Sequence, residues 1–204
     1  MPVPKIIVAE AHDGYNFLLM TKLSGEMSCS YANLKNIEST VIALAKGLKM
    51  LWGVDVANCP CVNSVHEKLI QARYNIDNNL VDVEDFNPET FTTEGFTDIS
   101  GLYEYLEQNR PAEDLVFSHG DFCLPNIFVS GENVTGFVDW GNGGIADRWQ
   151  DIALCVRSLK HNYIEDGLYN ENDYQKYRQL FFHELGIVPN EEKIRYFILM
   201  DELF

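Results

Sequence analysis

Two short apolar stretches with a turn between them open the chain. Residues 5–11 (KIIVAEA) and 15–22 (YNFLLMTK) each have the composition of a strand, and His12-Asp13-Gly14 separates them. Asp-Gly is favoured in tight hairpin turns, because both residues tolerate a positive φ. The pattern therefore predicts two paired strands. Two strands cannot bury both of their faces, so the pair resembles the end of a larger sheet.

From residue 31 onward the apolar spacing becomes helical. Apolar residues recur at steps of three and four, which places them on one face of a helix: Leu34, Ile37, Val41, Leu44, Leu48 and Leu51. We expect one long core helix here and further helices over residues 64–76, 99–106, 147–160 and 171–185. Gly186 is expected to end the last of these, since glycine adopts the left-handed cap conformation. Asn190 then caps a final helix that runs into residues 201–204.

The remaining pattern predicts short strands and one long loop. Residues 115–118 form an apolar strand, and residues 127–129 and 134–138 form a hairpin around Ser130-Gly131-Glu132-Asn133. Residues 82–97 have no clear period and are expected to be a loop. They lie in a stretch between Arg73 and Arg110 that contains nine acidic residues and no lysine or arginine. Long loops of this kind tend to be functional, and an acidic one could recruit a cation or simply be solvated.

Composition and charge narrow the classes of function. The 204 residues are 46% hydrophobic and carry 31 acidic against 15 basic side chains, a net charge of −16. This charge argues against binding nucleic acid or an anionic membrane, and it favours a cationic small molecule. No apolar run is long enough for a membrane-spanning helix. Five cysteines without an export signal indicate reduced thiols in a cytoplasmic protein, and Cys59-Pro60-Cys61 has no second ligand pair for a metal.

One ordered set of polar residues carries the chemistry. The strand at 115–118 is followed by His119-Gly120-Asp121, then by Asn126 five residues after Asp121, and by Asp139 after the hairpin. Phosphoryl transfer needs one carboxylate that orients the attacking hydroxyl and accepts its proton, and oxygen ligands that hold Mg²⁺ against the nucleotide phosphates. Asp121 suits the first task. Asn126 and Asp139 suit the second, because Mg²⁺ prefers hard oxygen ligands.

At these residues a family resemblance becomes plain. Residues 115–158 (LVFSHGDFCLPNIFVSGENVTGFVDWGNGGIADRWQDIALCVRS) resemble the catalytic core of the aminoglycoside 3'-phosphotransferases, antibiotic-resistance kinases with a protein-kinase-like fold. Further similarity lies at Pro2-Val3-Pro4-Lys5, His12-Asp13-Gly14, Cys59-Pro60 and the terminal Asp201-Glu202-Leu203-Phe204. The resemblance implies an α+β fold: a mainly helical C-terminal lobe with short β-hairpins over residues 26–204. Residues 1–25 would then be the remnant of an N-terminal lobe and its hinge.

The resemblance also implies a role for individual residues. Asp121 would be the catalytic base, and Asn126 and Asp139 would be the Mg²⁺ ligands. ATP would be held at the hinge by Met20, by backbone groups of Thr21 and Leu23, and by Val138 under the adenine ring. Ammonium groups of the aminoglycoside would be bound by Asp201, Glu202, the carboxylate of Phe204, Asn87 and Glu89. Asp151 would brace the catalytic loop by hydrogen bonds, and His119 would pack behind that loop.

Two departures from the family pattern change the expected activity. Asn142 stands where members usually carry an arginine after the Asp-x-Gly, which removes a positive charge near the phosphates. Lys5 and Lys22 fit neither the strand nor the spacing of the phosphate-binding lysine in the nucleotide-covering lobe. Leaving one adenine face uncovered costs roughly 2–3 kcal/mol, which is nearly two decades of affinity. We therefore expect impaired kinase activity and either an upstream segment or a truncated relic.

Two alternatives remain open from the residues alone. The chain could bind aminoglycosides without turnover, as an inactive binding module or truncated kinase relic. It could also be a metal-dependent hydrolase that uses His119 and Asp121. The second alternative needs further histidine ligands, and His12, His66, His161 and His183 show no ligand spacing.

Overall fold

The computed structural model describes residues 1–82, 84, 86–87, 90–91, 94–165 and 168–204. The chain forms two compact units, each assembled from three stretches. The first unit comprises Met1–Leu51, Phe122–Trp140 and Ser158–Val188. The second comprises Trp52–Asp121, Gly141–Arg157 and Pro189–Phe204. No helix among the described residues is both long enough and apolar enough to cross a membrane.

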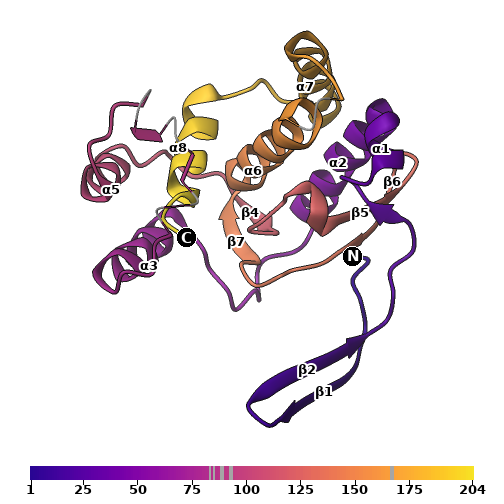
Figure 1. The fold of residues 1–204 in the computed structure, drawn as a ribbon, viewed down its shortest axis with the longest axis horizontal. Coiled ribbons are helices and arrows are strands. Elements are labelled where there is room, and N and C mark those ends of the chain that lie inside the picture. Colours follow the sequence, from indigo (N-terminus) through magenta and orange to yellow (C-terminus); the bar gives the residue numbers. More distant parts are fainter. Residues whose placement is uncertain (83, 85, 88–89, 92–93, 166–167) are drawn as a thin grey trace. The chain divides into compact units, whose positions relative to one another are not determined.

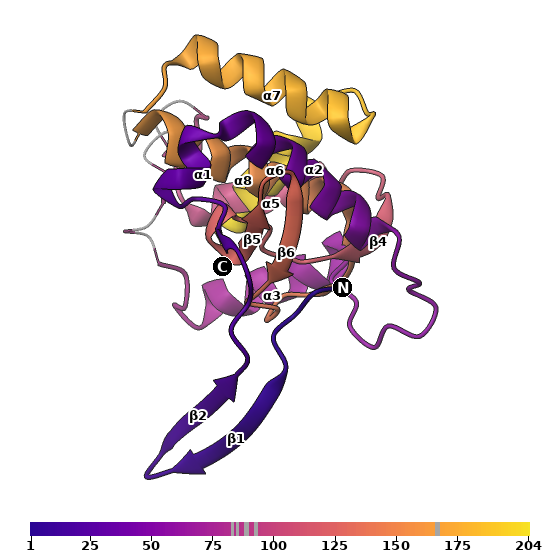
Figure 2. The ribbon, with the colours of Figure 1, turned by 90° about the vertical axis from the view of Figure 1, so that its right-hand side faces the viewer.

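The predicted N-terminal hairpin is present in the first unit. Strands β1 (Ile6–His12) and β2 (Tyr15–Met20) pair antiparallel, and the turn between them contains Asp13 (φ 49°) and Gly14 (φ 81°). Two consecutive left-handed residues match the right-handed twist of the strands. The hairpin projects from the rest of its unit (Figures 1 and 2), and every residue of both strands is exposed.

The prediction of one long helix from the apolar stripe is wrong, because the structure has two helices there. Helix α1 (Tyr31–Lys35) ends at Asn36, and α2 (Ile37–Trp52) begins after it. The reason is a competing hydrogen bond. The Thr40 hydroxyl donates to the Asn33 carbonyl at 2.9 Å, and the Asn36 amide donates to the same carbonyl at 3.0 Å, so the regular ladder is interrupted there. The stripe itself is buried as predicted, with Val41, Leu44 and Leu48 fully inaccessible.

A three-stranded sheet completes the first unit together with the remaining helices. Its order is β3 (Glu26–Met27), β5 (Ile127–Ser130) and β6 (Asn133–Phe137), and the 3₁₀ turn η1 (Leu124–Asn126) leads into β5. The β5–β6 hairpin confirms the prediction, whereas the two residues of β3 are too few to show a period. The π-helix η2 (His161–Glu165) precedes α7 (Glu171–Leu185), which ends at Gly186 with φ 73° as expected. Helix α7 lies beside α2, where Lys49 donates to the Glu184 carbonyl at 2.5 Å (Figure 2).

The second unit is mainly helical. It contains α3 (Val65–Asp77), α5 (Ile99–Gln108), the two-stranded sheet of β4 (Leu115–Ser118) and β7 (Gly144–Asp147), and α8 (Glu191–Asp201). Asn190 caps α8 as predicted, and Ser64 and Asp98 cap α3 and α5. Helix α6 (Arg148–Lys160) begins in this unit. We expected α6 to start at Asp147, but Asp147 ends β7 and its carboxylate caps the helix by accepting the Trp149 amide at 3.0 Å.

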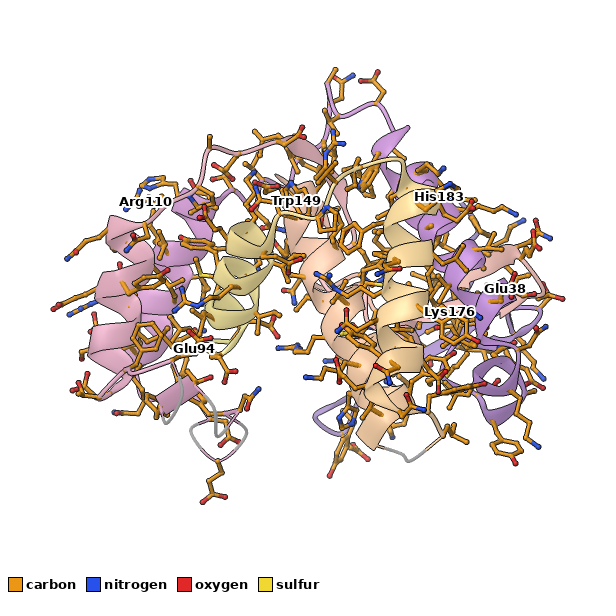
Figure 3. All side chains as sticks on the ribbon, turned by 90° about the horizontal axis from the view of Figure 1, so that it is seen from above. Glu38, Glu94, Arg110, Trp149, Lys176 and His183 are labelled. Carbon is orange, nitrogen blue, oxygen red and sulfur yellow. The ribbon has the colours of Figure 1, made fainter. Side chains whose placement is uncertain are left out.

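The acidic loop over residues 82–97 is tied to α8. The Arg195 guanidinium pairs with the Glu94 carboxylate at 2.5 Å. The Glu202 carboxylate accepts hydrogen bonds from the Asn87 amide at 3.1 Å and the Thr90 hydroxyl at 3.3 Å. Figure 3 labels Glu94 beside this helix. These contacts reach the middle of α8 and its C-terminal end. The expectation of a loop throughout residues 82–97 is wrong at Thr90 and Phe91, which are helical.

Candidate active site

The loop that follows β4 is mounted on a buried carboxylate. The backbone amides of His119 and Gly120 donate to the two oxygens of Asp151 at 2.8 and 2.9 Å, and the Ser118 hydroxyl also donates to it. Asp151 is fully buried in α6. Burial raises the pKa of Asp151 to about 6, although these three donors act in the opposite direction. The predicted bracing role of Asp151 is confirmed.

Gly120 is fixed in a conformation that a side chain would not permit. Its φ is 84°, and a Cβ at this position would lie 2.0 Å from the carbonyl oxygen of Asn142. The Gln150 side chain donates to the Gly120 carbonyl at 2.8 Å, and Asn63 donates to the Asn142 carbonyl at 2.8 Å. Sequence reasoning missed Asn63 and Gln150, because neither has a motif that ties it to a loop far away in the chain.

Asp121 directly follows His119 and Gly120, whose amides bind Asp151, and it is half-buried. Its amide donates to Nδ1 of His119 at 3.4 Å, and His119 is fully buried. Since Nδ1 accepts a hydrogen bond, the neutral ring carries its proton on Nε2. The expectation that His119 packs behind the loop is confirmed.

Asn126 and Asp139, the predicted metal ligands, flank the β5–β6 hairpin in the first unit. Ile127 pairs with Phe137, and just beyond this pair the Val138 amide donates to the Asn126 carbonyl at 3.0 Å. Asp139 comes next and is exposed, with φ 62°, a conformation that costs energy for a residue other than glycine. The hairpin therefore hydrogen-bonds the Asn126 backbone to Val138, the residue that precedes Asp139.

The chemistry of this donor pair fits Mg²⁺. Asn126 offers an amide oxygen and Asp139 a carboxylate, and Mg²⁺ sites commonly combine one or two such protein ligands with water and substrate phosphates. Among the described residues no group of three or more histidine, cysteine, aspartate and glutamate side chains could hold a metal ion. Asn126 and Asp139 therefore stay a prediction as metal ligands.

The predicted nucleotide residues Met20, Thr21, Leu23 and Val138 also belong to the first unit. The Thr21 amide donates to the Lys5 carbonyl at 2.9 Å, and the Lys5 amide donates to the Thr21 hydroxyl at 2.9 Å. Because the Thr21 amide is used in this way, the Thr21 carbonyl is the backbone group that could bond a nucleotide. The Leu23 side chain lies against β6, because a Cβ on Gly136 would be 2.3 Å from Leu23 Cδ1. The hinge and the strand that ends before Val138 are therefore in contact.

The carboxylates expected to bind the antibiotic lie at the end of α8 in the second unit. Asp201 forms an ion pair with Arg157 at 2.5 Å. Glu202 is half-buried, and burial raises its pKa while the Asn87 amide and Thr90 hydroxyl partly offset that effect. The backbone of Asn87 thus contacts Glu202, and Glu89 lies outside the described residues. Arg157 was missed by sequence reasoning, because it stands in an apolar stretch of α6 with no charged neighbour in sequence.

One lysine stands among these carboxylates. Lys68 on α3 has its pKa lowered by burial, and the charges of Asp201, Asp151 and Asp121 act against that shift. Its ammonium lies 4.6 Å from the centre of the Phe204 ring. Lys68 therefore lies close enough to Asp201, Asp151 and Asp121 for their charges to stabilise its protonated form.

Comparison with known proteins gives a consistent result. Residues 1–180 match the model of the phosphotransferase enzyme family. An aminoglycoside 3'-phosphotransferase from Enterococcus faecalis is 41% identical over 206 residues, which cover 100% of this chain and 74% of that protein. The crystal structure of aminoglycoside-3'-phosphotransferase of type VIII matches with a TM-score of 0.82 at 29% identity, over 100% of this chain and 74% of its own. An aminoglycoside phosphotransferase from Streptomyces rimosus, solved with ADP and streptomycin, matches with a TM-score of 0.81 at 24% identity, over 99% of this chain and 75% of its own.

The chain belongs to the phosphotransferase enzyme family and, within it, to the aminoglycoside 3'-phosphotransferases. Its fold is the mixed α+β, mainly helical fold of these kinases. The expected fold class is confirmed, and the division at residue 25 stays a prediction.

Proposed function

We propose that this protein catalyses the nucleotide-dependent phosphorylation of a hydroxyl group on an aminoglycoside, with ATP as the donor and Mg²⁺ as the metal. The observation that supports this most is the mounting of Asp121. The residues before it are held by the Asp151 carboxylate at 2.8 and 2.9 Å, and Gly120 has no room for a side chain. Such rigid positioning is what phosphoryl transfer asks of its protein groups.

Each polar group then has a task. Asp121 orients the attacking hydroxyl and accepts its proton while the new oxygen–phosphorus bond forms and the bond to the leaving nucleotide diphosphate breaks. Asn126 and Asp139 would hold Mg²⁺, which would neutralise charge on the phosphates. The Thr21 carbonyl and the Leu23 amide bond the adenine edge, Val138 lies under the ring, and Met20 belongs to the strand that leads into this hinge.

The acidic side of the second unit is assigned to the antibiotic. We assign its ammonium groups to Asp201, Glu202, the carboxylate of Phe204, Asn87 and Glu89. These carboxylates are unequal. Asp201 already has the Arg157 guanidinium as a partner and Glu202 accepts two hydrogen bonds from the loop.

Binding without turnover is the second candidate. The groups assigned to the antibiotic all belong to the second unit, whereas the hinge residues and the metal ligands belong to the first. Antibiotic binding could thus persist where nucleotide turnover is weak. The chain also spans only 74% of the length of the Enterococcus faecalis relative, so turnover by the 204 residues is the quantity to measure.

The test combines calorimetry with a product assay. The chain is titrated with kanamycin, and phosphorylated kanamycin is then sought by mass spectrometry after incubation with ATP and Mg²⁺. Asp121→Asn should lower turnover by about 10²–10⁴-fold and leave kanamycin affinity nearly unchanged, whereas Asp77→Asn, an exposed acid on α3, should change neither. Binding without any product supports the binding module. A folded chain that does not bind kanamycin contradicts both candidates.

A further inference from the structure

A short segment before α3 extends the sheet that leads into the catalytic loop. Cys61 and Asn63 flank Val62, which forms a parallel bridge with Ile145 of β7. The Ile145 amide donates to the Cys61 carbonyl at 2.9 Å, and the Asn63 amide donates to the Ile145 carbonyl at 2.7 Å. Strand β7 in turn pairs with β4, the strand that precedes His119-Gly120-Asp121 (Figure 1). The backbone of Asn63 is therefore fixed alongside this sheet.

The Asn63 side chain reaches the segment that enters β7. Its Nδ2 donates to the Asn142 carbonyl at 2.8 Å, although 79 positions separate the two residues in the chain. A Cβ on Gly144 would lie 2.7 Å from the Cys61 carbonyl oxygen and 3.1 Å from Asn63 Nδ2. The absence of a side chain at Gly144 therefore leaves the space through which Asn63 approaches Asn142.

The Asn142 carbonyl that Asn63 binds also lies against Gly120. Helix α6 holds the two polar groups of Gly120, because Asp151 accepts from its amide at 2.9 Å and Gln150 donates to its carbonyl at 2.8 Å. The Asn142 carbonyl lies against its Cα instead, since a Cβ there would be 2.0 Å from this oxygen. Gly120 is thus supported from α6 by two side chains and from outside α6 by a carbonyl that Asn63 holds.

We propose that Asn63 is a positioning residue for Asp121, which acts by holding the Asn142 carbonyl against Gly120. The inference rests on the proposed function, since it takes Asp121 as the group that orients the attacking hydroxyl. The contact uses the backbone of Asn142, so it does not depend on which side chain this position carries. Alignment matters for such a group, because a misplacement of about 1 Å can cost about a hundredfold in rate.

The test measures kcat and KM for the phosphorylation of kanamycin by Asn63→Ala. The variant loses the donor to the Asn142 carbonyl, so Asp121 should lose its alignment and keep its charge. We expect kcat to fall about tenfold to a hundredfold and the KM for kanamycin to change by less than about twofold. Asn78→Ala is the matched control and should change neither quantity. It removes an exposed amide of the same kind, which donates to the Tyr74 carbonyl at 2.8 Å at the other end of α3.

Two double-mutant cycles check the path from Asn63 to Asp121. In an Asp121→Asn background, Asn63→Ala should have no further effect on kcat, because the base that it positions is gone. In urea denaturation, Gly120→Ala should shift the midpoint less in an Asn63→Ala background, because the Asn142 carbonyl is then able to move away from the new Cβ. Asn63→Ser is a second variant in case Asn63→Ala fails to fold. It should lower kcat in the same way, because the shorter serine side chain does not reach this carbonyl.

The two proposals fail in different ways. If the unchanged chain forms no phosphorylated kanamycin, or if Asp121→Asn keeps its kcat, the proposed function is wrong and the positioning role is overturned with it. If Asp121→Asn lowers kcat but Asn63→Ala and Asn63→Ser do not, only the positioning role is overturned. Equal losses from Asn63→Ala with and without Asp121 also overturn it, because the effect would then not pass through the base. Additive midpoint shifts for Gly120→Ala and Asn63→Ala would show that Asn63 does not act through the contact with Gly120.

Discussion

The Gly120 amide and the Asp151 carboxylate are 2.9 Å apart, although 31 positions separate them in the chain. This hydrogen bond links the loop that presents Asp121 to the interior of α6. It places an ionisable group with a raised pKa directly beneath the proposed catalytic base. Both the loop geometry and its response to pH therefore depend on the same buried side chain.

We expect Gly120→Ala to destabilise the protein strongly. The alanine would have to adopt a left-handed φ, and its Cβ would lie 2.0 Å from the Asn142 carbonyl oxygen. This backbone oxygen also accepts a hydrogen bond from Asn63. Gly186→Ala is the control, since Gly186 has a similar φ of 73° and no atom within 4 Å of the added carbon. Urea denaturation should show a loss of about 1–2 kcal/mol for the control and a clearly larger loss for Gly120→Ala. Equal losses would contradict the close contact with Asn142.

The titration of Asp151 should be visible in the pH dependence of stability. Its pKa is raised from 3.8 to about 6 on folding, so its contribution is fully present below about pH 4 and declines as the pH rises through 6. The total decline is on the order of 2–3 kcal/mol. The other carboxylates also titrate in this range, so the quantity to follow is the difference in unfolding free energy between the protein and its Asp151→Asn variant.

That difference should decrease between pH 4 and pH 7 and stay constant above pH 7. Asp151→Asn should also be less stable throughout, because an amide cannot accept from the His119 and Gly120 amides with both of its ends. A difference that does not vary with pH would show that Asp151 keeps one protonation state over this range.

Asp139→Gly should separate stability from metal binding. Glycine adopts φ 62° without strain, so the free energy of unfolding should stay the same or rise by up to about 1 kcal/mol. The loss of the carboxylate should weaken the binding of the Mg²⁺ complex of a non-hydrolysable ATP analogue far more than it weakens the binding of kanamycin. Calorimetry with both ligands checks this. Equal losses for the two ligands would argue against Asp139 as a metal ligand.

Gly136→Ala should affect nucleotide binding through the hinge. The added carbon would lie 2.3 Å from Leu23 Cδ1, so the Leu23 side chain has to move away from β6. Because the Leu23 amide is assigned to the adenine edge, we expect the affinity for the ATP analogue to fall about threefold to tenfold, the value of one weakened hydrogen bond. Kanamycin affinity should not change. An unaltered affinity for the nucleotide analogue would place the adenine elsewhere.

Local sequence patterns were sufficient to predict most of the helices and strands. The stripe from Leu34 to Leu51, the Asp13-Gly14 turn, the Asn190 cap and the Gly186 terminator all depend on residues within one or two turns of each other. Two of the wrong predictions concern features that no local pattern of apolar residues marks. The break at Asn36 comes from the Thr40 side chain, and strand β7 is formed by Gly144–Asp147, which needs β4 as a partner. Gly144–Asp147 has only Ile145 and Ala146 as apolar residues, so no apolar run marks it as a strand.

The order His119-Gly120-Asp121, Asn126 and Asp139 is visible in the sequence, because residue types and short spacings are local properties. The tertiary structure alone decided which distant side chains hold them. Asp151 is bonded to Gly120, Arg157 to Asp201 and Asn75 to Leu203, over separations of 31, 44 and 128 positions. Asp151 and Asn75 are buried by the packing of α6 and α3, and each buried donor or acceptor must then find a partner within the protein. Arg157 and Asp201 are partly exposed, and only the packing of α6 against α8 brings their opposite charges together.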